Sequence, residues 1–155
     1  MWTAAAVLAC ALSVLGRSEA SMAPIQLVDV APPGSSVGAE AYVRSGTIYL
    51  ITSSSVFQDA LSSRIGCSAT NAIRKLASIL AHEQWHVRHG PDEKAAYQHQ
   101  LITLIQLGLH PGSGVYRDVQ TSMLRIVALR KRNAPEPNGP EPNGPEHLLA
   151  RITPF

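Results

Sequence analysis

The 155-residue chain has little cysteine, little charge and no long apolar run, and each shortage excludes a class of protein. Two cysteines are too few for a disulfide framework or a cysteine-rich zinc cluster. Thirteen basic and eleven acidic residues give a net charge of +2, which offers no electrostatic footprint for a nucleic-acid partner. The apolar run at residues 2–16 is shorter than the roughly 18 residues that a membrane span requires. We therefore expect a small globular domain without a stable membrane span.

The N-terminal run matches the apolar centre of a signal peptide. Small residues, Ser18 and Ala20, occupy the −3 and −1 positions of a cleavage after Ala20. We therefore predict a signal peptide over residues 1–20 and a secreted or periplasmic protein, with a buried N-terminal helix as the alternative. A lipid anchor at Cys10 is a minor option. If residues 1–20 are removed, Cys67 remains as a lone cysteine, and a small buried hydrophobic role is favoured for it.

The opposite end of the chain is of low complexity. The sequence Pro-Glu-Pro-Asn-Gly at 135–139 is repeated at 140–144. Proline at every second or third position removes the amide donors that helices and sheets need. We therefore predict an extended tail over 133–155, which leaves a folded domain over 21–132.

The pattern of this domain predicts an α+β fold, in which a small N-terminal hairpin or sheet precedes a helical part. Apolar and β-branched stretches predict strands at 25–30, 39–44 and 47–52, and Ser45-Gly46 joins the last two as a hairpin. Helices are expected at 55–63, 71–89, 91–109 and 114–132. Thr70 or Asn71 is expected to cap the second of them, and Pro91 to be the first residue of the third. In the long helix, an apolar stripe predicts the buried face: Ile73, Leu76, Ala77, Leu80 and Val87.

The sequence His82-Glu83-Gln84-Trp85-His86 lies in that long helix and predicts a zinc site. Two His four residues apart project from the same helical face, close enough to bind one Zn²⁺ per chain. Glu83 is rotated by about 100° from His82, which places it beside the metal rather than on it. A carboxylate there can act as the general base that takes a proton from a water on the metal. This is the His-Glu-x-x-His motif.

A catalytic zinc site needs a third protein ligand, and three residues compete for that role. Glu93 ranks first, because a reversal at Gly90-Pro91 can return the next helix across the first with Glu93 in its opening turn. His89 ranks second, although three ligands on one straight helix would follow its axis rather than surround the ion. Asp92 ranks third, since an acidic residue at a helix N-terminus also suits the helix dipole.

The stretch from residue 76 to 100 resembles the gluzincins, and among them the short, single-domain minigluzincins. In these families the two His of the motif and a downstream Glu bind zinc, which implies His82, His86 and Glu93 here, with Glu83 as general base and then proton donor to the leaving amine. The family pattern Glu-x-x-Ala/Ser-Asp is matched by Glu93-Lys94-Ala95-Ala96-Tyr97, in which Tyr97 replaces the usual Asp. The Asp supports a ligand His, a role that the Tyr97 hydroxyl or Gln100 could take.

The resemblance implies a zinc metalloendopeptidase-like hydrolase that acts on peptides or proteins. The strand at 47–52 is expected to be the sheet edge along which an extended peptide binds. Four residues are candidates for stabilising the oxyanion, and the sequence leaves the choice open: Tyr97, His99, His110 and Tyr116. The alternative function is a zinc-bound structural or protein-binding module without turnover. A third hypothesis is an inhibitor or adaptor whose proline-rich tail binds partners.

Overall fold

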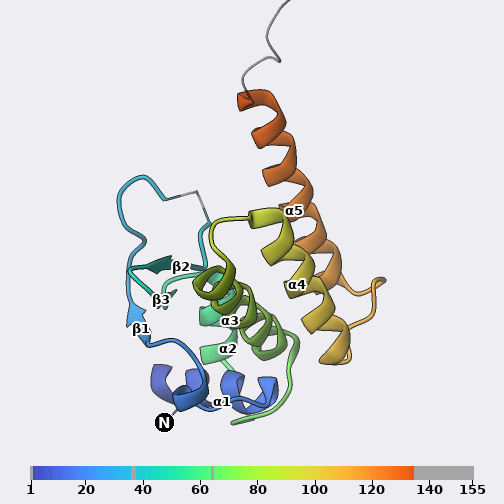
Figure 1. Ribbon diagram of the computed structural model, residues 1–155. Helices are drawn as coiled ribbons and strands as arrows, with labels where there is room; N and C mark the ends of the chain where they lie inside the picture. Colours follow the sequence, from blue (N-terminus) through green and yellow to red (C-terminus); the bar gives the residue numbers. More distant parts are fainter. Residues whose placement is uncertain (1, 36–37, 64, 135–155) are drawn as a thin grey trace, which may run out of the picture.

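The computed structural model describes residues 2–35, 38–63 and 65–134. In these residues it shows an α+β fold with a three-stranded sheet and five α-helices, which confirms the expected class (Figure 1). The elements follow in the order α1 (Ala4–Leu15), the 3₁₀ turn η1 (Glu19–Ser21), β1 (Ile25–Val28), β2 (Ala41–Arg44), β3 (Thr47–Ile51), α2 (Ser55–Leu61), α3 (Asn71–His89), α4 (Glu93–Gln106) and α5 (Gly114–Asn133). The predicted tail from residue 135 onward lies outside the described residues.

The sheet has the strand order β1-β3-β2, so β3 is its central strand. β1 runs parallel to β3, with Ile25 opposite Ile48, and β2 runs antiparallel to β3. The predicted hairpin between β2 and β3 is confirmed. Ser45 and Gly46 have φ angles of 49° and 75°, as a two-residue type I′ turn requires.

Helix α3 runs through the middle of the molecule, between α1, α2 and the sheet on one side and α4 on the other (Figure 1). Thr70, one of the two predicted caps, caps its N-terminus by accepting a hydrogen bond from the Ile73 amide. The predicted apolar stripe packs in the main core, with Leu76 and Leu80 fully buried. The consecutive residues 78–83 are all buried as well, because α4 covers the face opposite the stripe. The motif residues therefore lie within the fold rather than on an open helix surface.

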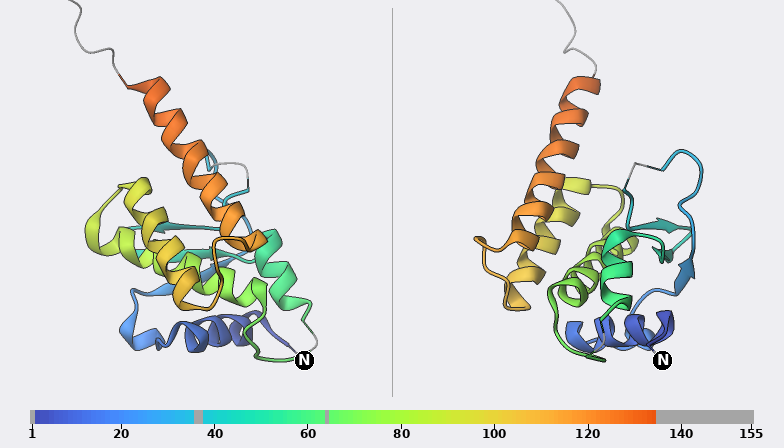
Figure 2. Two further views of the ribbon diagram at one scale, coloured as in Figure 1. Left: turned by 90° about the vertical axis from the view of Figure 1, so that its right-hand side faces the viewer. Right: turned by 180° about the vertical axis from the view of Figure 1, so that it is seen from behind.

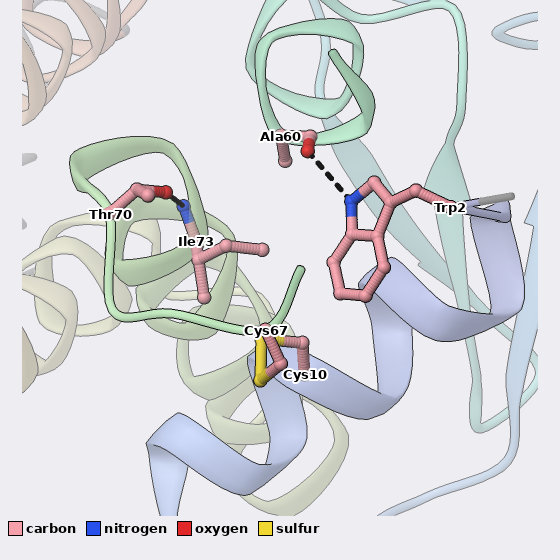
Figure 3. Close-up of a disulfide and its surroundings, with 6 residues drawn as sticks. All are labelled: Trp2, Cys10, Ala60, Cys67, Thr70 and Ile73. Carbon is pink, nitrogen blue, oxygen red and sulfur yellow. Dashed lines mark hydrogen bonds between the residues drawn. A yellow bond between two sulfur atoms is a disulfide. The ribbon is translucent and has the colours of Figure 1, made fainter. Parts of the chain in front are cut away.

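Helix α1 belongs to the core, which is the alternative that the sequence left open for this segment. Five of its residues are buried: Val7, Leu8, Cys10, Ala11 and Leu12. Trp2, just before the helix, donates a hydrogen bond from its indole nitrogen to the Ala60 carbonyl at 3.0 Å (Figure 3). Cleavage after Ala20 stays a prediction, and it would remove all these contacts. In the described part of the chain, no helix has both the length and the apolar character to span a membrane.

A disulfide joins Cys10 of α1 to Cys67 in the segment before α3, across a sequence separation of 57 residues (Figure 3). Cys67 is exposed. The prediction of Cys67 as a lone, buried hydrophobic cysteine is therefore wrong. It depended on the removal of Cys10, whereas α1 carries Cys10 into the fold beside the α3 N-terminus.

Helices α4 and α5 lie side by side, and the last turns of α5 extend beyond the rest of the molecule (Figure 2). A second, smaller core forms between them from Leu101, Leu104, Leu109 and Val119. The prediction that Pro91 begins α4 is wrong: the helix begins at Glu93, and Asp92 is its N-cap. The Asp92 carboxylate accepts a hydrogen bond from the Ala95 amide, which satisfies one of the free amides of the first turn and favours a helix start at Glu93.

Candidate metal centre

His82 and His86 lie one turn apart on α3, and their imidazoles meet on its α4 side. The two Nε2 atoms are 3.1 Å apart, and the rings are inclined at 71°. His82 is only 7% exposed, and His86 is half-buried. The structure therefore brings the two predicted ligands together, with the same nitrogen of each ring directed at a common point.

Glu93, the first-ranked third ligand, comes to the same point from α4. Its Oε2 atom lies 3.4 Å from Nε2 of His82, and its Oε1 atom lies 3.5 Å from Nε2 of His86. In a tetrahedral zinc site with bonds of about 2.0–2.1 Å, neighbouring ligand atoms are about 3.3 Å apart. The distance between the two Nε2 atoms, and the distance from each of them to its nearer Glu93 oxygen, lie close to this value. His82, His86 and Glu93 thus form a group that could hold a metal ion.

Gly90 makes this convergence possible. Its φ of 90° lies in the region that favours glycine, and this residue ends α3 so that α4 can return across it. Its carbonyl also accepts a hydrogen bond from Nδ1 of His86 at 2.8 Å. A neutral imidazole that donates through Nδ1 keeps the Nε2 lone pair free for a metal. Sequence reasoning missed this support, because it depends on the turn after the helix.

Contact between His86 and Glu93 shifts the pKa values of both side chains. The hydrogen bond to Glu93 raises the pKa of His86 above its usual value, although burial works in the opposite direction. Hydrogen bonds to His82 and His86 hold the pKa of Glu93 far below the ordinary carboxyl range. Glu93 is therefore a carboxylate at any pH near neutrality, which is the form that binds metal.

The other two candidates for the third ligand lie apart from the group. His89 is exposed, donates from Nδ1 to the Trp85 carbonyl at 3.1 Å and stacks on the Trp85 ring. The Asp92 carboxylate caps α4. Each thus has a structural role of its own, and among the described residues the convergent group contains neither.

Glu83 lies on the adjacent face of α3 and is 8% exposed. It lines a cavity of about 370 Å³ together with His82 and Glu93. Burial raises the pKa of its carboxyl, while the nearby His82 and His86 lower it. A buried carboxyl with a raised pKa beside a metal-ligand group is suited to accept and return a proton.

The cavity is bounded by β2 and the residues before it, by α3 and α4, and by α5. An ion pair lies in its wall, with Nζ of Lys75 2.7 Å from Oε1 of Glu40. The prediction that 47–52 forms the sheet edge is wrong, because β3 is paired on both sides. The edge strand on the cavity side is β2, which contributes Ala41 to the lining.

In the described residues, neither Tyr97 nor Gln100 makes the hydrogen bond to a ligand His that was expected of one of them. Gln100 donates its amide to the hydroxyl of Ser78 at 3.2 Å. The rings of Tyr97 and His82 pack in a T-shaped arrangement, with centroids 4.6 Å apart. Nδ1 of His82 is buried without a hydrogen-bond partner in the described residues. Packing, rather than an acceptor in the place of the family's Asp, therefore positions this imidazole.

Of the four oxyanion candidates, Tyr97 is the one that lines the cavity. Burial, followed by the charge of Glu93, raises its pKa to about 12, so its hydroxyl keeps its proton and can donate. Tyr116 packs against the second core, and His99 and His110 are exposed.

Comparison of the chain with known protein families, with curated proteins and with solved structures gave no match in any of the three.

Proposed function

We propose that the protein is a zinc-dependent peptidase of the zincin type, with zinc held by His82, His86 and Glu93. The observation that carries the proposal is the convergence of three ligand residues beside the buried carboxyl of Glu83 in one cavity: the two Nε2 atoms are 3.1 Å apart, and each has an oxygen of Glu93 within 3.5 Å. A purely structural zinc site has four protein ligands, whereas a catalytic one has three and a free position. Three ligands and an adjacent carboxylate favour the enzyme over the non-catalytic module.

In this mechanism a zinc ion would polarise the peptide carbonyl and acidify the attacking water. Glu83 accepts the proton of that water at its carboxylate and then delivers it to the amine nitrogen that leaves. Tyr97 supplies a hydroxyl that stays protonated up to about pH 12, which suits a donor to the developing oxyanion. His86, oriented by the Gly90 carbonyl, keeps its Nε2 atom toward the ligand group.

The edge of β2 is the natural place for an extended substrate. β2 pairs with β3 on one side, and among the described strands no strand pairs with its other side. Ala41 of β2 and the residues before it line the same cavity as Glu83. A peptide added along this edge would use main-chain hydrogen bonds, which suits binding of varied sequences.

Cleavage of a mixed peptide library by the wild-type chain and by Glu83→Gln tests the activity. The wild type with one equivalent of Zn²⁺ is expected to cleave peptides, and Glu83→Gln to lose at least about 100-fold of the rate, since it keeps the shape but cannot take a proton. Asp118→Asn is the matched control, because Asp118 is exposed and does not line the cavity. Full activity in Glu83→Gln would refute the assigned base. Bound zinc without cleavage of any peptide would favour the structural module.

We also propose that the protein is exported. The Cys10–Cys67 disulfide supports this, because disulfides persist mainly in oxidising compartments. The same bond ties the predicted signal peptide into the core. N-terminal sequencing of exported protein distinguishes a chain that keeps α1 from one that begins at Ser21.

A further inference from the structure

Helix α5 forms one wall of the cavity with a single face. Four of the residues that line the cavity are spaced at i, i+3, i+4 and i+7 along this helix: Ser122, Arg125, Ile126 and Leu129. Residues at these spacings lie on the same side of a helix. Arg125 is the charged member of this face.

The other lysine or arginine of the lining already has a counter-charge. Lys75 is paired with Glu40 at 2.7 Å, and Glu93 faces the two imidazoles. Arg125 is exposed, and no carboxylate of the described residues lies within 4.0 Å of its guanidinium. The cavity therefore offers a positive group without an internal partner.

We propose that Arg125 binds a carboxylate of the peptide in the cavity and gives the site a preference for acidic substrates. That the ligand is a peptide rests on the proposed function; the exposed guanidinium of Arg125 in the cavity wall does not. A guanidinium presents paired N–H donors whose geometry matches a carboxylate. Two parts of a peptide carry that group, an Asp or Glu side chain and the free C-terminus.

The test measures peptide binding by fluorescence anisotropy, in the full-length chain carrying Glu83→Gln to prevent turnover and supplied with one equivalent of Zn²⁺. Three labelled peptides of the same length are compared. The first has blocked ends and one Glu, the second has a free C-terminus and no acidic side chain, and the third has blocked ends and Gln in place of Glu. At low ionic strength, we expect one or both carboxylate peptides to bind roughly threefold to tenfold more tightly than the neutral one.

The preference should disappear in Arg125→Gln, be partly kept in Arg125→Lys and turn toward a Lys-containing peptide in Arg125→Glu. Arg132→Gln is the matched control, because Arg132 is an exposed cation of the same helix that does not line the cavity. Equal binding of the three peptides, absence of binding, or a preference that survives Arg125→Gln would overturn the assignment. Zinc content and cleavage by the chain with Glu83 intact are measured separately, so a failure of the proposed function is distinguished from a failure of this one.

Discussion

Replacing Glu93 by Gln tests the third ligand directly. The Glu93 oxygens lie 3.4 and 3.5 Å from the Nε2 atoms of His82 and His86, and Gln keeps the length of the side chain while removing its charge. Loss of a residue that merely supports a ligand costs about 10- to 100-fold in metal affinity. Loss of a ligand should reach at least the upper end of that range, which is about 2.7 kcal/mol.

Asp92→Asn is a closely matched control for this change. It removes the same charge one residue earlier, and Asn caps a helix about as well as Asp, so α4 should begin at the same place. Zinc affinity is measured for both variants and the wild type by competition with a chromophoric chelator, with thermal unfolding to verify the fold. We expect a loss of about 100-fold for Glu93→Gln and less than about threefold for Asp92→Asn. Equal affinities of the two variants would refute the assignment of Glu93.

Three further predictions concern the fold and its charges. Cys10→Ser should lower the free energy of unfolding by about 4 kcal/mol in urea titrations, because the bond to Cys67 closes a loop of 57 residues; an unchanged midpoint would contradict this. Deletion of residues 1–20 should cost roughly 5 kcal/mol or more, since it removes five buried side chains, whereas equal stability would show that α1 is dispensable. In metal-free protein, the lowered pKa of Glu93 means that its carboxylate stabilises the fold above the usual pKa of 4.5. The raised pKa of His86 means that its protonated ring stabilises the fold below the usual pKa of 6.5, and this stabilisation is lost as the pH rises through the raised pKa of the folded state. The melting temperature of metal-free protein should therefore be highest between about pH 4.5 and 6.5 and lower at pH 8. A melting temperature that increases up to pH 8 would contradict the raised pKa of His86.

The features that were predictable from the sequence are those with local causes. The spacing of His82 and His86, the cap at Thr70 and the turn at Ser45-Gly46 depend on a few consecutive residues, and the structure has each of them. The apolar stripe of α3 is also a local pattern, and it correctly indicated the core side. Glu93 was placed by a slightly longer inference, from a glycine turn and the helix that follows it.

The remaining features depend on packing between distant segments. The parallel pairing of β1 with β3 makes β3 central, although the sequence shows only a hairpin and a separate strand. Nothing local indicates that α5 closes the cavity and carries Arg125 into its wall. Cys10 and Cys67 were not paired because the apolar run of α1 has the composition of a signal peptide as well as that of a core helix.

Zinc content tests the central claim most directly. The full-length chain, purified without chelators or an affinity tag that binds metal, is analysed by elemental mass spectrometry beside His82→Gln, and circular dichroism verifies that both are folded. The account predicts about one zinc per wild-type chain and almost none in the variant. Folded wild-type protein that contains no zinc, and takes up none when it is supplied, would contradict the account.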